Sequence, residues 1–286
     1  MTEERTNKVV VGMDSSDEAA AALRWAQAYA GADDAIVAIH SWETPYAVYM
    51  AVTPPQLGDL EQLAKEELER LLSGSGDPRI VPMLLEGRPG ESIVSEGRDA
   101  DAIVIGHRGT SRVSMMLGST ANYVLHHATR PVIVVHGDGG SATRRVVVGV
   151  DDHGLDDGGD NHAVRALRWA YAVPGVERIE VVHAWSLQPT AYDFFGTVQL
   201  YERDVEAATA GVVDRVVDIA GPPPAGVELV RRVVRESAGR ALLEASSGAD
   251  LVVVGSRGRG GFTGLLLGST SGEVAAHCAV PVAVIR

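Results

Sequence analysis

The chain contains the same pattern twice, and this repeat constrains its fold more than any other feature. Each half opens on an apolar run that ends in aspartate, KVVVGMD in the first and RVVVGVD in the second. Self-similarity over whole halves indicates a duplicated domain, and 286 residues is the length of about two domains. The matched blocks are 8–14 with 145–151, 22–26 with 166–170, 36–42 with 179–185, 100–109 with 249–258, 117–120 with 267–270 and 130–135 with 280–285.

Short runs of valine and isoleucine alternate with helical patterns in both copies. The runs show little polar alternation, which is typical of strands covered on both faces. We expect strands at 8–13, 36–41, 79–85, 102–106 and 132–136, and again at 145–150, 179–184, 227–233, 250–255 and 281–285. We expect helices at 17–30, 56–73, 90–98, 118–127, 161–172, 196–219, 237–246 and 268–277, with Asp17 and Ser237 as N-caps.

Regular strand–helix alternation predicts an α/β fold with a parallel sheet flanked by helices. The fold class is therefore two tandem doubly wound domains. We place the first at 1–137 and the second at 144–286, with Gly137–Thr143 (GDGGSAT) as the linker. Ligands of such sheets bind beyond the carboxyl ends of the strands.

Charge and composition exclude several classes of partner. The formal net charge is −13, which disfavours nucleic acid and anionic membranes, because both attract basic proteins. No run of 18 apolar residues suggests a membrane span. The N-terminus lacks the apolar core of a signal peptide, and a single cysteine, Cys278, allows no intrachain disulfide. We therefore expect a cytoplasmic protein.

Asp14 and Asp151 stand at the end of the first strand of each copy. A carboxylate at this edge of a sheet can hold a metal ion bound to phosphates, or hydrogen-bond a ligand. Aspartate is also common in turns after strands. Because the residue recurs in both copies, we favour the ligand role and predict that Asp14 and Asp151 contact nucleotide-bound Mg²⁺.

The fourth strand of each copy runs into a glycine-spaced loop, which reads GSRGRGGFTGLLLGST from Gly255 to Thr270 in the second copy. Gly255 and Gly258 are expected to allow a tight turn. Backbone N–H groups at the following helix start bind anions without a basic side chain. The chain has no GxxxxGK[ST] motif, and no GxGxxG follows the first strand, which disfavours a Walker-type loop and a dinucleotide oxidoreductase. No nucleophile–base pair recurs at the loop, so we assign no catalytic residue.

The strand-end aspartate, the strand ending in histidine and the G-x2-G-x9-G-S spacing resemble the universal stress protein family, in a tandem form that covers nearly the whole chain. The resemblance implies five-stranded parallel sheets of order 3-2-1-4-5, ATP as ligand, and a regulatory role in stress or dormancy responses. It also implies that the halves pack as a pseudo-dimer, that chains form homodimers, and that a regulatory protein is the partner. Enzymatic activity would be slow ATP hydrolysis at most.

The family's ATP contacts carry over to matching positions. Gly149–Asp151 resemble the segment beneath the nucleotide, and Ala184 resembles the position whose backbone contacts adenine. The later glycines and hydroxyl residues resemble the ribose and phosphate loop. The nucleotide-binding residues assigned in this way are Gly149, Val150, Asp151, Ala184, Gly255, Gly258, Gly268, Ser269 and Thr270, and in the first copy Gly12, Asp14, Ser41, Gly106, Gly109, Gly118, Ser119 and Thr120.

The two loops differ in length and composition. Eight residues without glycine (TSRVSMML) separate Gly109 from Gly118, whereas nine residues with three glycines (RGGFTGLLL) separate Gly258 from Gly268. The shorter, stiffer loop either still closes over a triphosphate or has lost that ability. Arg257 and Arg259 are candidates for phosphate contacts in the second copy.

Three alternatives from other classes stay open. The first is a scaffold that binds partners without nucleotide, the second is a sensor of cyclic AMP, and the third is an adenylate-transferring enzyme on a similar fold. The enzyme is the weakest of the three, because it needs a second substrate domain and the two copies occupy nearly all of the 286 residues.

Overall fold

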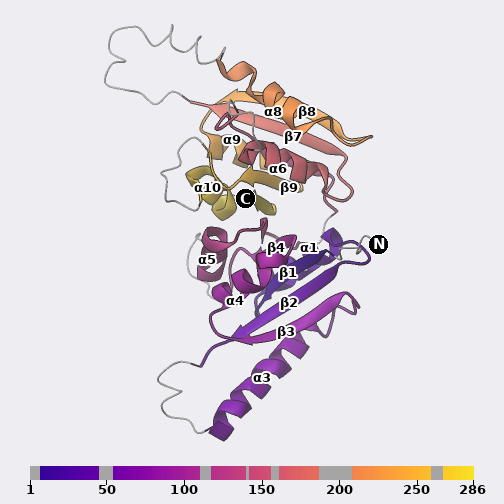
Figure 1. The fold of residues 1–286 in the computed structure, drawn as a ribbon, viewed down its shortest axis with the longest axis vertical. Helices are drawn as coiled ribbons and strands as arrows, with labels where there is room; N and C mark the ends of the chain where they lie inside the picture. Colours follow the sequence, from indigo (N-terminus) through magenta and orange to yellow (C-terminus); the bar gives the residue numbers. More distant parts are fainter. Residues whose placement is uncertain are drawn as a thin grey trace, which may run out of the picture. The chain divides into compact units, whose positions relative to one another are not determined.

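The structure is a computed structural model that describes residues 7–44, 54–109, 117–139, 142–155, 161–186, 208–258 and 267–286. The chain divides into two compact units, Met1–Ser141 and Ala142–Arg286. Each unit is an α/β domain built on a parallel five-stranded sheet (Figure 1). Among the described residues, no helix is both long enough and apolar enough to span a membrane.

The sheet of the first unit has the strand order β3-β2-β1-β4-β5, and every pairing in it is parallel. Helix α3 lies along β3 in Figure 1, and it also packs on β2. Helices α4 and α5 pack against each other. The elements are β1 (Lys8–Met13), α1 (Asp17–Tyr29), β2 (Ala35–Trp42), α3 (Pro54–Leu72), β3 (Ile80–Glu86), α4 (Pro89–Glu96), the 3-10 turn η1 (Gly97–Asp99), β4 (Ala102–Gly106), α5 (Ser119–His127) and β5 (Val132–Val135).

The second unit repeats this arrangement as β8-β7-β6-β9-β10, again with parallel pairings only. Helix α6 packs on α8, and α9 packs on α10. The elements are β6 (Arg145–Gly149), α6 (His162–Tyr171), β7 (Arg178–Trp185), α8 (Val212–Ala220), β8 (Glu228–Arg235), α9 (Ala238–Ser246), β9 (Leu251–Gly255), α10 (Ser269–His277) and β10 (Val282–Ile285).

The central strands are buried on both faces. In β4 the four residues Ala102–Ile105 are all buried, as are Leu251–Val254 in β9. Successive side chains of a strand point to opposite faces, so helices must cover both sides of each sheet. This explains why the valine and isoleucine runs show no polar alternation.

Two expected helix starts differ from the structure. Ser16, not Asp17, is the N-cap of α1: its side chain accepts a hydrogen bond from the Ala19 N–H at 3.1 Å. Asp17 is instead the first helical residue, where its charge suits the helix dipole. Within the helix expected at 196–219, residues 208–210 are helical, Gly211 breaks the helix with a turn, and α8 begins at Val212. The earlier part of that prediction lies largely outside the described residues.

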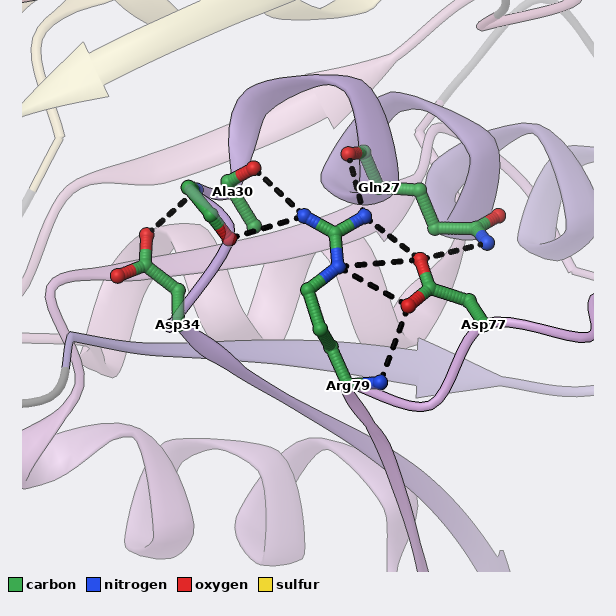
Figure 2. Close-up of polar contacts among 6 residues, drawn as sticks. Gln27, Ala30, Asp34, Asp77 and Arg79 are labelled. Atoms are coloured by element: carbon green, nitrogen blue, oxygen red, sulfur yellow. Dashed lines mark hydrogen bonds and ion pairs between the residues drawn. The ribbon is translucent and has the colours of Figure 1, made fainter.

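A partly buried ion pair joins the end of α1 to the start of β3 (Figure 2). Arg79 donates to the carbonyl oxygens of Gln27 (2.9 Å), Ala30 (2.7 Å) and Gly31 (3.0 Å). It also binds Asp77, with Nη2 2.6 Å from Oδ2. The last carbonyl groups of a helix have no partner within the helix, so this guanidinium caps α1.

The first unit extends past its last strand onto α1. The side chain of Arg24 donates to the Asp138 carbonyl at 2.9 Å. Gly139 follows with a φ of +65°, and a Cβ at this position would collide with the Ala21 carbonyl. Only glycine satisfies both constraints at low cost. This part of the expected linker therefore packs on the first unit.

Candidate functional site

Each unit has a pocket at the carboxyl end of its sheet, beside its first strand. In the first unit β1 lies between β2 and β4, so the chain order reverses there, which is where ligands of such sheets bind. The first pocket has a volume of about 490 Å³, and the second, beside β6, has about 190 Å³. Every residue assigned above from the resemblance lines the pocket of its own unit.

The strand-end aspartates face the glycines that follow β4 and β9. Asp14 accepts hydrogen bonds from the backbone N–H (3.0 Å) and hydroxyl of Ser16 through Oδ1. Its other oxygen lies so close to Gly109 that a Cβ there would be 2.6 Å away. Asp151 likewise accepts from the His153 N–H at 3.1 Å, and its Oδ2 would collide with a Cβ on Gly258. Side chains at the two glycines would displace these carboxylates.

Neither Gly255 nor Gly258 has a positive φ, so the glycines are required here by the close approach of neighbouring atoms and not by a left-handed backbone. Gly258 gives room to Asp151. A Cβ on Gly255 would lie 2.7 Å from the His162 Cβ and 3.2 Å from its backbone. Gly106 meets the backbone of Glu18 at 2.9 Å in the same way. These glycines therefore bring the strand ends close to helices α6 and α1.

Helices α5 and α10 begin at the pockets. Gly118 and Gly268 hold their N-cap positions, and because glycine has no side chain, no side chain caps the first N–H groups of either helix. The N–H of Gly118 donates to the His107 carbonyl (2.9 Å), and that of Gly268 donates to the Ser256 carbonyl (2.8 Å). The first N–H groups of a helix have no partner within it, so those of Ser269 and its equivalent are available to an anion.

Part of each pocket's lining is apolar. In the first unit it contains Ile39 of β2, Ile93 of α4 and Ile105 of β4, and the equivalent residues of the second unit are Val182, Leu242 and Val254. Ser41 interrupts the first wall with a hydroxyl, whereas Ala184 continues the second wall with a methyl group. Each pocket thus combines an apolar wall with N–H donors and one carboxylate.

Charged groups at the second pocket influence one another. Burial raises the pKa of Asp151. Burial, followed by the charges of Arg165 and Arg257, lowers the pKa of His162. Arg257 lines the second pocket and Arg108 lines the first, whereas Arg259 falls outside the described residues. Arginines are thus the strongly basic side chains described at the two pockets.

The predicted metal contact has a limited donor set. Among the described residues, no three histidine, cysteine, aspartate or glutamate side chains gather into a metal site. Asp14 and Asp151 each provide one carboxylate at a pocket. One carboxylate together with ligand phosphates is a common way for proteins to hold Mg²⁺, so these residues fit a metal that arrives with a nucleotide.

The strand-end histidines have structural hydrogen bonds. His40 Nδ1 lies 3.0 Å from the Met13 carbonyl, and His183 Nδ1 lies 2.9 Å from the Val150 carbonyl. Because a carbonyl only accepts, Nδ1 carries the proton in both rings. These bonds fasten the second strand of each unit to the end of the first.

The chain's two lysines lie away from the pockets. Lys8 begins β1, at the opposite end of the strand from Asp14, and donates to the Glu96 carbonyl and to Asp99. Lys65 is exposed on α3. The basic groups described at the pockets are therefore arginines.

The model of the universal stress protein family matches residues 5–136 and 142–286. The chain belongs to the universal stress protein family. It is 33% identical to a universal stress protein of Mycolicibacterium smegmatis, covering 97% of this chain and 96% of the relative. A universal stress protein of Mycobacterium tuberculosis is 29% identical over the same shares of the two chains. The crystal structure of a universal stress protein from Archaeoglobus fulgidus has the same fold, with a TM-score of 0.66, 21% identity, and coverage of 98% of this chain and 96% of that one.

In this universal stress protein, several pocket residues have no equivalent among the sequence-derived assignments. The apolar residues Ile93 and Leu242 come from helices, and which helical residue faces a pocket depends on packing that a single sequence does not reveal. Ser271 donates to the Gly255 carbonyl at 2.6 Å and fixes the start of α10. Alanine stands at the equivalent position of the first copy, Ala121, so the repeat gave no signal for Ser271. Residues 110–116 and 259–266 of the two loops lie outside the described part.

Proposed function

We propose that this universal stress protein binds ATP, with Mg²⁺, in both pockets and acts as a cytoplasmic regulator in stress or dormancy responses. The observation that carries the proposal is the recurrence of one pocket design in both halves. Each pocket combines apolar lining residues with a helix N-terminus approached by glycines. This is the chemistry that a flat base joined to phosphates requires.

The proposed roles follow the two ends of the ligand. The apolar wall covers the base, with the backbone at Ser41 or Ala184 at its edge. The N–H groups at the start of α5 or α10 bind phosphates, helped by Arg108 or Arg257. Asp14 and Asp151 contact the ligand or its metal ion. Because arginines and N–H groups supply the donors, phosphate binding needs no lysine.

Regulation would follow from occupancy of the pockets. Nucleotide would connect the loops after β4 and β9 to the helices that begin beyond them, and so change the surface offered to a regulatory protein or to a second copy of the chain. Slow hydrolysis would return that surface to its free state. The structure places the pockets within each unit, so the two can be examined separately.

The decisive experiment is calorimetric titration of the full chain with ATP, ADP, AMP and cyclic AMP, with and without Mg²⁺. We expect ATP with Mg²⁺ to bind most tightly, at two sites per chain. Ala184→Leu fills the second pocket and should remove one site, whereas Ser41→Leu should remove the other. A folded protein that binds none of the four ligands would support the nucleotide-independent scaffold, and tighter binding of cyclic AMP would support a different sensor.

A further inference from the structure

His162 begins helix α6 and packs against the end of β9, where Gly255 leaves room for it. Its ring Nδ1 lies 3.4 Å from Nη2 of Arg165 and 3.4 Å from the hydroxyl of the buried Ser256. A guanidinium only donates hydrogen bonds, so Nδ1 accepts here and carries no proton. The contacts of His162 are therefore those of a neutral ring, and a proton on Nδ1 would break them.

The charged groups that face this ring are arginines. Burial is the main cause that lowers the pKa of His162, followed by the charges of Arg165 on the same helix and Arg257 after β9. Arg286 after β10 adds to them, whereas a hydrogen bond to the Ile285 carbonyl acts in the opposite direction. Like charges repel strongly where little water separates them. Protonating His162 would therefore add a further positive charge to a group that is already cationic.

Neighbouring elements leave this charge in place. Asp151, at the end of β6, has its carboxylate against Gly258. Helix α8 packs on α6, and Arg168 of α6 donates to the Ile219 carbonyl of α8. In the described part of the chain, Arg165 Nε is buried and has no hydrogen-bond partner. The arginines beside His162 thus offer positive charge to an anionic ligand.

The segment that His162 contacts also forms part of the second pocket. Gly255 and Arg257, on either side of Ser256, line that pocket. The Ser256 carbonyl accepts a hydrogen bond from the N–H of Gly268, the N-cap of α10, at 2.8 Å. His162 therefore lies directly behind the residues that present Arg257 and the start of α10 to a ligand.

We propose that nucleotide binding in the second pocket and protonation of His162 favour each other, so that acid strengthens binding there; the inference rests on the proposed function. Ligand phosphates beside Arg257 offset its charge and so lower the cost of a proton on His162. Coupling between two binding events is reciprocal, so a protonated His162 attracts the phosphates in turn. The first unit has no histidine at this place, because Glu18 stands beside Gly106 where His162 stands beside Gly255.

The test titrates the full chain in the Ser41→Leu background, so that the second pocket alone binds. Calorimetry in buffers of different ionisation enthalpy counts the protons taken up with ATP and Mg²⁺. Near pH 6, the chain with His162 should take up about half a proton more than His162→Gln, the value for a proton affinity that rises about tenfold on binding. From pH 7.5 to 5.5, its ATP affinity relative to His162→Gln should rise by up to about tenfold. Asp151 and the ATP phosphates titrate in both proteins, so the difference isolates His162.

Two further variants keep the test decisive. Arg165→Met removes one repelling charge, so the extra proton uptake should move to higher pH, and this result does not depend on how well His162→Gln folds. His277→Gln, which removes an exposed histidine of α10, should behave as the chain with His162. Without ligand, the lowered pKa of His162 means that stability from the neutral ring is present above the unfolded value of about 6.5 and is lost as the pH falls. The ligand-free His162→Gln protein should therefore lose less stability in acid.

Two results would overturn the inference while leaving the proposed function standing. One is equal proton uptake by the chain with His162 and by His162→Gln. The other is an ATP affinity that changes with pH by the same factor in both proteins. Absence of ATP binding at the second pocket at every pH would instead overturn the proposed function there, and the inference with it.

Discussion

Arg79 provides the sharpest test of what holds the first unit together. Its guanidinium caps three carbonyl groups at the end of α1 and pairs with Asp77 at the start of β3. The side chains of Arg79 and Asp77 are only 21% and 11% exposed. Arg79→Met keeps much of the aliphatic volume but removes every one of these donors. Asp77 then stays as a largely buried carboxylate without its main partner.

The expected cost follows from that burial. Removing one member of a buried ion pair costs about 3–5 kcal/mol, and partial exposure places this pair near about 3 kcal/mol. For a domain of this size, each kcal/mol lowers the unfolding temperature by roughly 2–4 °C. We therefore expect the transition of the first unit to fall by roughly 6–12 °C in Arg79→Met.

The second unit contains a matched control. Arg178 pairs with Glu228 at the edge of its sheet, at 2.9 Å, but the two side chains are 44% and 60% exposed. An exposed pair contributes about 0–1 kcal/mol, so Arg178→Met should change stability little. Urea unfolding followed by circular dichroism measures both variants. Equal costs for the two substitutions would refute the assignment of Arg79 as a buried clamp.

The same clamp predicts how stability depends on pH. The hydrogen bond from Arg79 is the main cause that lowers the pKa of Asp77 in the folded protein. A lowered carboxyl pKa contributes stability above the unfolded value of about 3.9, and that stability is lost as the pH falls below it. The wild type should thus exceed Asp77→Asn in stability at neutral pH, and the gap should narrow below about pH 4. A gap that stays constant down to pH 2 would contradict this origin.

The remaining predictions concern the pockets and are read by ATP titration. Asp151→Ala should weaken binding at one site and change the free energy of unfolding by less than about 1 kcal/mol. Because burial raises the pKa of Asp151, lowering the pH should begin to weaken ATP binding at that site at a pH above the ordinary titration range of aspartate. Gly258→Ala should displace the Asp151 carboxylate and cost about ten- to a hundredfold in affinity, whereas Gly248→Ala, with open space around its Cβ position, should cost nothing. Replacing Lys8 and Lys65 together should leave ATP affinity unchanged; loss of binding by a folded double variant would contradict phosphate recognition by N–H groups and arginines.

The sequence was most informative where one residue fixes local geometry. The valine runs placed the strands within one or two residues, because strands buried on both faces leave little choice of residue type. The strand-end aspartates and the spaced glycines pointed to the residues that the structure brings to one pocket per unit. Asp14 meets Gly109, which lies 95 residues further on, and it was the repeat that allowed the two to be associated.

What the sequence could not predict depends on three-dimensional contacts. The segment Ser15-Ser16-Asp17 offers three acceptable caps, and the choice of Ser16 depends on its bond to Asp14. Arg79 resembles an ordinary surface arginine in the sequence, because three of its partners are backbone carbonyls and the fourth, Asp77, is only two residues away. The apolar walls are equally hidden, because Ile93 and Leu242 belong to helices whose rotation is set by packing.

The two copies agree and differ for a physical reason. The aspartate–glycine contact recurs in both units because an added Cβ on the glycine strikes the carboxylate, so either partner is hard to replace alone. No comparable steric constraint preserves the contacts of Arg79. In the second unit Glu228 stands at the register position equivalent to Arg79, and it forms an exposed ion pair with Arg178 instead of capping a helix. Ser41 and Ala184 hold the same strand position in the two units, and the Ser41 hydroxyl has no hydrogen-bond partner among the described residues. This strand position therefore accepts either side chain, because no hydrogen bond in the described structure depends on the hydroxyl.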